Sequence, residues 1–389
     1  MRTEDTNTDP RPDETQGDES LLREIRETFS AYKEYWREAH EHRAKLMRYL
    51  CGDPWDETDR KARQDLGRPC ISHDELNQYV NQCINAKRQN KTGIKIEPKG
   101  NGANDKTAEL RQDLARTIEY NSQAQATYLQ AFQDEVEGAY GFIRVTRRYV
   151  SDDSDEQEIL IAPIPNPDSV LYDPTCKKPD WSDAERCLVL DPMTVENFNA
   201  EFPDAKVTSF SSEEISMAPD WITDKGVVVA EYWKVVKTKR KSTAPSGRTI
   251  YEKHVVQYIT NGVEILEVNP QTKEMGEEIP VVPFVGMQRW VNSGSGAKRR
   301  LFALPSLALD PQMSLAYYAS QAAEEAGLSP KVPYVGYVGQ FETDAEAWQT
   351  ATKQPHSTLQ ADPVVDASNG QVLPLPRREQ FTPNFGAYE

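Results

Sequence analysis

The residues that could carry out chemistry are few in this sequence. The densest group is an acidic run that comprises Asp152, Asp153, Asp155, Glu156 and Glu158. Clustered carboxylates are typical ligands of divalent cations, but this run lacks the glycine that a calcium loop needs for its sharp turn. We interpret it as the solvated tip of a hairpin, and we keep a metal-dependent enzyme that uses it as a less favoured alternative.

Histidine and cysteine do not supply a metal site either. His40 and His42 are two residues apart on a predicted helix, so their side chains point in different directions. The spacing of Cys70, His73 and Cys83 matches no zinc motif. We interpret the two cysteines as buried thiols and the histidine as a residue at the start of a helix.

Glycine-rich and nucleophile motifs are equally uninformative. The stretch at residues 294–298 lacks the G-x-x-x-x-G-K-[ST] pattern of a phosphate-binding loop, and no strand leads directly into it. The sequence contains no G-x-S-x-G elbow and nothing that singles out a nucleophile and its base. We therefore expect no enzyme, no metal site and no cofactor.

Composition indicates an acidic, soluble protein. The 389 residues include 45 basic and 62 acidic side chains, which give a net charge of −17. Tight binding of phosphates needs concentrated Lys and Arg, so the chain is not built to hold nucleic acid. No apolar run approaches the roughly 20 residues of a membrane span. The five cysteines are odd in number and widely spaced, as is typical of reduced thiols in a cytosolic product.

Two basic clusters stand out against this acidic background. The first lies in a predicted hairpin loop, is interpreted as a solvated face, and consists of Lys234, Lys237, Lys239, Arg240 and Lys241. The second directly precedes a predicted helix and consists of Lys298, Arg299 and Arg300.

Apolar periodicity predicts the elements that position these residues. A long helix is expected from about Ser20 to Leu50, with one apolar stripe that Arg43 interrupts. Capping-box patterns begin at Ser72, Ser122 and Thr343. The further predicted helices span residues 72–90, 107–120, 122–138, 194–202 and 343–352. The predicted strands span residues 94–98, 141–150, 158–163, 166–173, 187–190, 227–236, 249–260, 263–268, 279–284 and 332–338.

One more predicted helix has an unusual composition. Asp310 is expected to cap it, Pro311 to occupy its first position and Gly327 to end it. Between them seven of the 15 side chains are Ala or Ser and are spread around the helix, so neighbouring helices can approach closely on almost every side. Both an ordinary core helix and a helix packed against copies of itself in a ring fit this composition.

The predicted fold class is α+β, with an elongated subunit. An acidic tail at residues 1–19 is expected to be disordered. It is followed by a helical block at 20–140, a β-rich block at 141–292, a linker with the small-residue helix at 293–328, and a small α+β end at 329–389.

The order of these elements resembles the portal proteins of tailed bacteriophages, in the branch of the short-tailed phages. The matching residues are individually weak and are specific only through their order and spacing. They are Gly67-Arg68-Pro69, residues 77–85, Ala131-Phe132, Gly138-Ala139-Tyr140-Gly141, Asn166-Pro167-Asp168-Ser169-Val170, Tyr172-Asp173-Pro174, Asp180-Trp181-Ser182-Asp183-Ala184 and Asp310-Pro311-Gln312.

The resemblance implies a homo-oligomeric ring, usually of twelve copies, at one capsid vertex. Double-stranded DNA would enter and leave through its channel without sequence specificity. The first two blocks would form the wing, the small-residue helix a stem helix, and residues 329–389 a clip. The implied partners are the terminase motor, tail adaptor proteins and the major capsid protein, in a virion assembled in the host cytoplasm. The alternative is another virion adaptor or a scaffold-type interaction protein.

The resemblance also assigns roles to residues. Channel or inter-subunit positions on the stem helix would be Asp310, Gln312, Ser314, Tyr317, Tyr318, Ala319, Gln321 and Ala322. Lys298, Arg299 and Arg300 would contact passing phosphates or a neighbouring subunit, and Trp348 would contact a partner at the clip.

Portal proteins of this branch are expected to continue past the clip, with a return stem helix, a channel loop and a helical crown. This sequence ends at Gly386-Ala387-Tyr388-Glu389. We therefore expect a fragment, a split or decayed gene, or a shortened relative.

Overall fold

The computed structural model describes two compact units. The first comprises residues 1–47 and 78–306, and the second comprises residues 48–77 and 307–389. The division differs from the sequence-based one, because residues 48–77 group with the C-terminal part rather than with the helical block. The described residues are 12–91, 93–100, 103–151, 153–203, 205, 221, 226–241, 249–269, 276–293, 296–328, 332–351 and 356–378.

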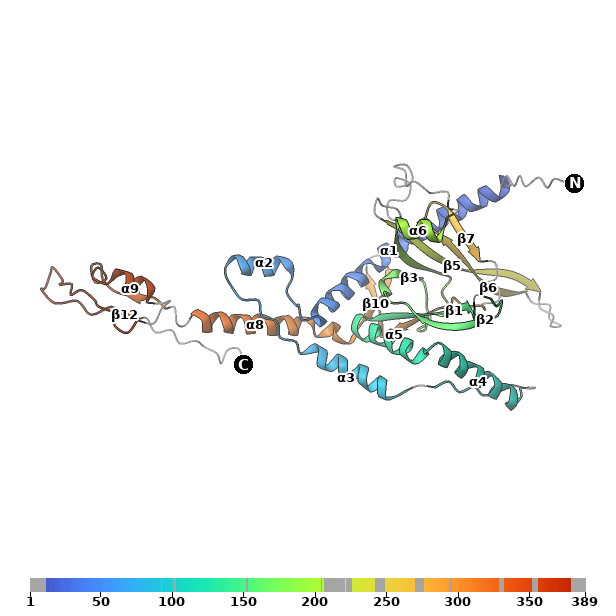
Figure 1. The fold of residues 1–389 in the computed structure, drawn as a ribbon, viewed down its shortest axis with the longest axis horizontal. Coiled ribbons are helices and arrows are strands. Elements are labelled where there is room, and N and C mark those ends of the chain that lie inside the picture. Colours follow the sequence, from blue (N-terminus) through green and yellow to red (C-terminus); the bar gives the residue numbers. More distant parts are fainter. Residues whose placement is uncertain are drawn as a thin grey trace. The chain divides into compact units, whose positions relative to one another are not determined.

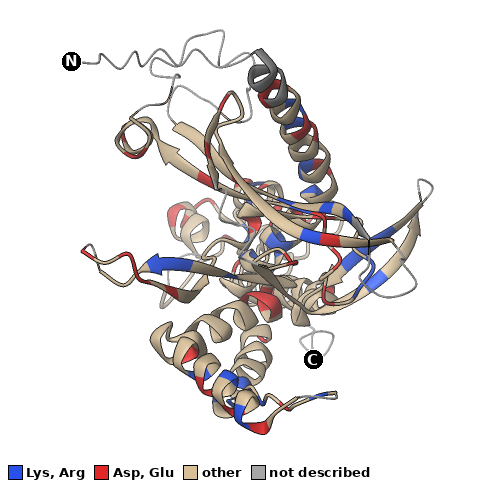
Figure 2. Ribbon diagram, turned by 90° about the vertical axis from the view of Figure 1, so that its right-hand side faces the viewer, with Lys and Arg blue, Asp and Glu red and all other residues tan. Residues whose placement is uncertain are grey.

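The predicted long helix is confirmed as α1, Pro12–Leu50. Its apolar stripe is buried, and Ile25, Phe29, Trp36 and Leu46 are all at most 4% exposed. In Figure 2 the long helix that follows the N-terminal label carries basic and acidic bands along its outer side.

The helix begins eight residues earlier than predicted. Proline is well tolerated in a first turn, where no N–H needs a partner. The prediction of a disordered tail differs from the structure at residues 12–19, which belong to α1. Residues 1–11 lie outside the described residues.

Three antiparallel sheets make up the β-rich part of the first unit (Figure 1). One has the strand order β2-β1-β8, one consists of β9 and β10, and the largest has the order β3-β4-β5-β6-β7. The predicted hairpin of β1 and β2 is confirmed. The strands predicted at 227–236, 249–260 and 263–268 are found as β5, β6 and β7, which pair in chain order as an antiparallel meander. The strands are β1 Tyr140–Tyr149, β2 Gln157–Pro163, β3 Val170–Tyr172, β4 Arg186–Thr194, β5 Gly226–Lys241, β6 Thr249–Thr260, β7 Ile265–Asn269, β8 Val281–Val285, β9 Met287–Ser293 and β10 Gly296–Phe302.

An aromatic cluster joins α1 to two of these sheets. Trp36 of α1 meets Tyr140 of β1 and Trp181 with ring centroids 5.4 and 5.8 Å apart. Tyr172 of β3 completes the cluster at 5.4 Å from Trp181, and its carbonyl oxygen accepts the indole N–H of Trp36 at 2.8 Å. Aromatic pairs at these separations contribute about 0.5–1.5 kcal/mol beyond the area that they bury. The cluster is the centre of the core of this unit.

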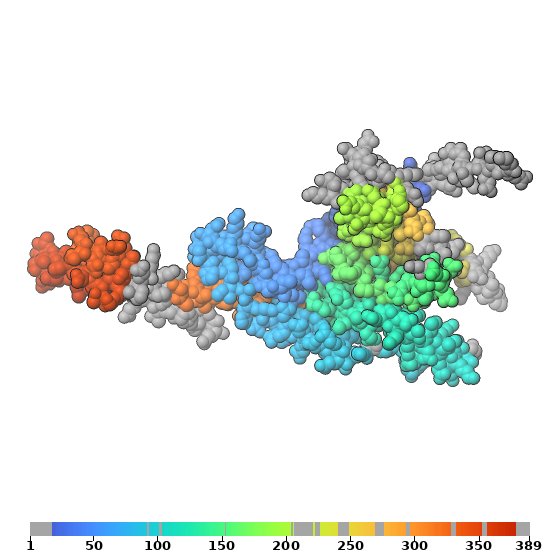
Figure 3. Space-filling model, in the orientation of Figure 1, coloured from blue at the N-terminus to red at the C-terminus, as the bar shows by residue number. Residues whose placement is uncertain are grey.

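The helices of the first unit lie around the sheets. They are α3 Leu76–Gln89 (which begins in the second unit), α4 Asp105–Asn121, α5 Ala124–Gly138 and α6 Val195–Glu201, with a short 3-10 helix at Pro167–Ser169. α4 and α5 pack against β2, and α5 also packs against β1. Figure 3 shows α4 and α5 side by side at the surface. Residues 94–98, predicted as a strand, pair with no strand, and the N–H of Ile96 donates instead to the side chain of Gln112 in α4 at 3.1 Å.

The three predicted capping boxes are wrong. At the start of α3 the carboxylate of Asp74, not Ser72, accepts the backbone N–H groups of the first turn. The hydroxyl of Ser122 accepts the N–H of Ile161 in β2 at 3.0 Å. The hydroxyl of Thr343 donates to Asp362. In two of the three cases the partner comes from a distant segment, which a local pattern does not contain.

The predicted linker at residues 293–300 is also wrong. Gly296–Phe302 forms β10, which pairs with β9 along seven positions from Gly296–Ser293 to Phe302–Met287.

The second unit contains the small-residue helix. Its elements are α2 Glu57–Asp65, the 3-10 helix Leu304–Leu307, α8 Leu309–Leu328, β11 Tyr334–Val335, α9 Ala345–Thr350 and β12 Arg377–Arg378. The 3-10 helix begins in the first unit. The strand predicted at 332–338 is reduced to the two residues of β11, which pair with β12. Within the described part of the chain, no helix is both long enough and apolar enough to cross a membrane.

The contact between β1 and α5 tests this fold. A Cβ atom on Gly141 would lie 2.3 Å from the carbonyl oxygen of Ala131, which is backbone and cannot rotate away. We expect Gly141→Ala to lower the free energy of unfolding by about 1–3 kcal/mol, the usual cost of overpacking. Gly93→Ala is the matched control, because nothing lies within 4 Å of its Cβ position. Equal denaturant midpoints for the two variants would contradict the described packing.

Candidate functional site

The helix α8 has one buried face. Leu309, Gln312, Ala316 and Ser320 recur at steps of three or four residues and are all buried. This spacing places them on one side of an α-helix. The side chains on that face are mostly small, so the helix lies close to the segment that it covers, residues 71–75 of the same unit.

The ends of α8 differ from the prediction. The N–H of Gln312 donates to the carbonyl of Ala308 at 3.0 Å, so the first helical bond starts two residues before Asp310. Pro311 still lies in the first turn, where its missing N–H costs nothing. Gly327 does not end the helix, which continues to Leu328.

Two polar side chains attach α8 to the backbone of residues 71–75. The hydroxyl of Ser320 accepts the N–H of Ile71 at 2.8 Å. The amide of Gln312 donates to the carbonyl of His73 and accepts the N–H of Glu75 at 3.3 Å. A backbone N–H or C=O group that loses water without gaining a partner costs about 1–3 kcal/mol. Ser320 and Gln312 avoid this cost by bonding the backbone groups of the segment that α8 approaches.

A buried arginine supports the same helix. Arg63 of α2 donates to the carbonyl of Pro69 at 3.1 Å and lies 3.7 Å from the carboxylate of Glu324 in α8. Its guanidinium also lies over the rings of Trp55 and Tyr317, at 5.1 and 5.5 Å. Arg63 therefore fixes α2 against one side of α8.

The predicted stem residues separate into three groups by exposure. Asp310, Ser314, Tyr317 and Tyr318 are exposed. Ala319, Gln321 and Ala322 are half-buried. Gln312 is buried and its amide is used within the chain, so we withdraw it from the predicted channel or inter-subunit positions.

The predicted contact residues before α8 have partners inside the first unit. Arg299 is buried, donates to the carbonyl of Cys176 at 3.0 Å, and stacks on Trp181 with 4.6 Å from its guanidinium carbon to the ring centroid. Arg299 is thus engaged inside its own unit, and its contact with DNA or a neighbour stays a prediction. Lys298 and Arg300 are partly exposed, and both pair with the carboxylate of Glu38 in α1.

Trp348 is likewise engaged within its own unit. Its ring centroid lies 5.2 Å from that of Tyr334 and 5.1 Å from that of Phe341. Its indole N–H donates to the carbonyl of Gln360 at 2.6 Å. These contacts hold α9 onto the rest of the predicted clip, and a contact with a partner remains a prediction.

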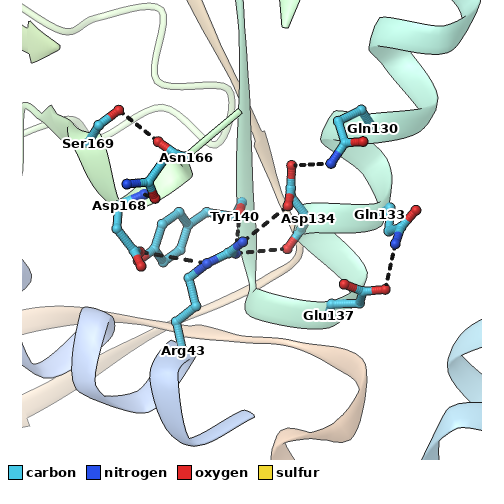
Figure 4. A network of polar contacts seen from close by, with 9 residues as sticks. All are labelled: Arg43, Gln130, Gln133, Asp134, Glu137, Tyr140, Asn166, Asp168 and Ser169. Carbon is cyan, nitrogen blue, oxygen red and sulfur yellow. Dashed lines mark hydrogen bonds and ion pairs between the residues drawn. The ribbon is translucent and has the colours of Figure 1, made fainter. Parts of the chain in front are cut away.

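Sequence reasoning missed the polar network around Arg43 (Figure 4). Arg43 of α1 is buried and donates to the carbonyls of Asp134 and Tyr140, at 3.1 and 3.0 Å, and to the carboxylate of Asp134 at 3.1 Å. Asp168 lies 3.6 Å from its Nε and accepts the hydroxyl of Tyr140 at 2.5 Å. The signal was present in the sequence, because Arg43 interrupts the apolar stripe of α1.

Burial sets the pKa values around this network. Desolvation raises the pKa of Asp134 even though Arg43 opposes the shift. Desolvation lowers the pKa of His40. It also lowers the pKa of His42, and the positive charges of Lys45 and Arg300 lower that pKa further. Both histidines are therefore neutral at pH 7.

The described residues contain no group of three or more His, Cys, Asp or Glu that could hold a metal ion. Asp152 of the acidic run lies outside them. Glu158 of the same run pairs with Arg148 at 2.6 Å across the β1–β2 hairpin.

Comparison with known proteins identifies the family. A family model described as "Phage P22-like portal protein" matches residues 26–387, from α1 past β12 and so through both units. The chain belongs to the P22-like phage portal protein family. This confirms the resemblance read from the sequence and the α+β portal-like fold class.

A curated member of this portal family is also similar. The "Portal protein" of Acyrthosiphon pisum secondary endosymbiont phage 1 is 25% identical over 367 residues, which covers 83% of this chain and 49% of the relative. The chain thus spans about half the length of the curated portal protein that it matches.

The attachment of α8 in this portal-family chain can be tested at one hydrogen bond. Ser320→Ala removes the acceptor of the Ile71 N–H and is expected to cost about 1 kcal/mol. Amide exchange at Ile71 should become about fivefold faster. Ser314→Ala is the control, because its exposed hydroxyl bonds only within α8, to the carbonyl of Asp310. Unchanged exchange at Ile71 would show that Ser320 does not hold the segment.

The half-buried histidines His40 and His42 predict a dependence of stability on pH. A histidine whose pKa is lowered on folding stabilises the fold above its ordinary value of 6.5. That contribution is lost as the pH falls, because the unfolded chain binds the proton first. The free energy of unfolding should therefore decrease from about pH 7.5 to about pH 5.5, as followed by tryptophan fluorescence in urea.

A variant with His40→Gln and His42→Gln should show a smaller decrease over the same range. The raised pKa values of Asp134, Glu135 and Glu137 act in the opposite sense, but they are common to both chains and cancel in the comparison. His356→Gln, at an exposed position, serves as the reference substitution. Parallel pH curves for wild type and the double variant would contradict the prediction.

Proposed function

We propose that this chain is a subunit of a viral portal, a ring at one capsid vertex through which DNA is packaged and ejected. The observation that carries the proposal is the match of the portal family along residues 26–387. The composition of α8 supports it independently, because a ring of closely packed helices requires small side chains at the contacts.

The two sides of α8 that are exposed or half-buried suggest how the ring forms. At 100° per residue, Leu315, Ala319, Ala322 and Ala326 form one strip beside the buried face. All four are exposed or half-buried. We assign this strip to the contact with the neighbouring copy, in a ring of twelve. Such a contact is head-to-tail, and it closes into a ring when the rotation between copies divides a full turn.

The face of α8 opposite the buried one is polar. Ser314, Tyr318, Gln321 and Glu325 share it, with Asp310 at its edge. We assign this face to the channel. Because it carries acids and no Lys or Arg, it would let double-stranded DNA pass without binding its phosphates.

The remaining partners follow from the same proposal. The predicted clip, residues 329–389, exposes three large apolar side chains in its described part, Val338, Val372 and Leu375, at 96, 64 and 73%. A docked terminase motor, and later a tail adaptor, would cover these side chains. The first unit, as the wing, would meet the major capsid protein. The assembled ring would be a virion component formed in the host cytoplasm.

The mass of the particle in solution tests the ring directly. We expect native mass spectrometry and electron microscopy of this chain to show closed rings, with twelve copies as the dominant species. A chain that stays monomeric at high concentration would overturn the proposal.

The strip on α8 gives a sharper test. Ala319→Leu and Ala322→Leu should reduce ring formation while leaving the thermal unfolding of the monomer nearly unchanged. The reason is that overpacking costs about 1–3 kcal/mol at each contact and a ring repeats the contact at every subunit. Ala62→Leu, on the exposed side of α2 in the same unit, is the matched control. Equal loss of monomer stability would instead identify the strip as part of an ordinary core.

A further inference from the structure

The first unit contains a cavity that the portal function does not use. It has a volume of about 170 Å³ and lies between α1, the turn from α5 to β1, and β10. Its floor is aromatic and buried, with Trp36, Tyr140 and Trp181 at 4, 1 and 1% exposure. Half-buried side chains form the walls, and these are Tyr35, Ala39, His42, Leu301 and Phe302.

The rim of this cavity is positively charged. Lys298 and Arg300 both lie on the rim, and both pair with the carboxylate of Glu38. The distance from the Lys298 ammonium to the nearer oxygen of Glu38 is 2.9 Å. Arg299 also lines the cavity, but its guanidinium is buried and bonded to backbone carbonyls, so it is not part of the rim. His42 adds no charge at pH 7, because burial and the nearby cations lower its pKa. Two partly exposed cations therefore face the single carboxylate of Glu38, on a chain whose net charge is −17.

The size of the cavity limits what it can hold. Binding sites for cofactors and drug-sized ligands measure about 300–1,000 Å³, so such a molecule would not fit. A cavity of about 150 Å³ holds a benzene molecule, so the space here suits one aromatic ring or one large aliphatic side chain. An apolar pocket for a single side chain, surrounded by a polar rim, is the usual form of an anchor site between proteins.

We propose that this cavity is the docking site for an acidic segment of another protein. The segment inserts one aromatic or large aliphatic side chain between Trp36 and Phe302, and it places flanking carboxylates against Lys298 and Arg300. Charge decides the class of partner, because the rim attracts acidic segments while the rest of this acidic chain repels them. The inference goes beyond ring formation and does not depend on it.

The first experiment measures binding of short peptides to the full chain. The probe is acetyl-Glu-Phe-Glu-amide with 4-fluorophenylalanine at its centre, followed by fluorine NMR. We expect saturable millimolar binding that weakens severalfold when salt screens the rim, from about 50 to 500 mM. Acetyl-Glu-Ala-Glu-amide lacks the anchor and acetyl-Lys-Phe-Lys-amide reverses the charge, so each should bind at least tenfold more weakly.

Variants of the lining residues measure separately how much the apolar cavity and the charged rim contribute to peptide binding. Ala39→Leu fills the cavity from its wall and should weaken the binding of the acidic peptide about tenfold. Ala31→Leu, at an exposed position of the same helix, should not change it. Lys298→Gln with Arg300→Gln should weaken binding about fivefold at low salt and have no effect at high salt. Lys61→Gln, at an exposed position of α2, is the charge control. Circular dichroism of each variant confirms that it is folded.

Four results of the peptide measurements would overturn the proposal, and a fifth would come from self-association. They are equal binding of the lysine peptide, no binding of the acidic peptide up to 10 mM, binding unaffected by Ala39→Leu, and binding of 3-phenylpropionate as tight as that of the peptide. The last result would assign the cavity to a small carboxylate instead of a protein segment. Self-association of the chain that Ala39→Leu abolishes would assign it to a second copy, and so would also contradict a different partner.

Discussion

The buried charge of Arg43 is the constraint on which the first unit depends. A guanidinium taken out of water must find acceptors for its N–H groups, and removing one partner of such a group typically costs about 3–5 kcal/mol. Arg43 finds them in two carbonyls and two carboxylates, which come from α5, the start of β1 and the 3-10 helix before β3. One side chain of α1 therefore fixes the positions of three other segments.

This network also dictates residues around it. A Cβ atom on Gly138 would lie 2.0 Å from Nη1 of Arg43, so the end of α5 can approach only because this residue is glycine. Tyr140 both stacks under the guanidinium and begins β1, and its ring belongs to the aromatic cluster with Trp36. Tyr140 therefore belongs to both the polar network around Arg43 and the aromatic core.

Arg299 repeats this arrangement on the other side of the cluster. It is buried, bonds to backbone carbonyls and stacks on Trp181. A cation that is buried and bonded in this way does not attract phosphates at a distance. The sequence already shows an excess of acids, and the structure adds that several of the bases are used internally.

Local patterns were sufficient for most of the fold. Apolar periodicity predicted α1, and alternation predicted the β1–β2 hairpin and the meander from β5 to β7. The failures have a common physical cause. Gly296 and its neighbours looked like a linker because the strand that they pair with, β9, is itself short and irregular in pattern. Composition likewise singled out α8, but nothing local connects Ser320 to Ile71, since 249 positions separate them. Contacts of this kind are determined by the tertiary fold.

The attachment of α8 to residues 71–75 has a consequence for how this family can vary. Gln312 and Ser320 bind N–H and C=O groups that every residue type except proline carries. The side chains at positions 72 and 73 are exposed and take no part in these bonds. Positions 72 and 73 can therefore change their side chains while the helix keeps the same register on the segment. Asp74 cannot change in the same way, because its carboxylate accepts the first N–H groups of α3.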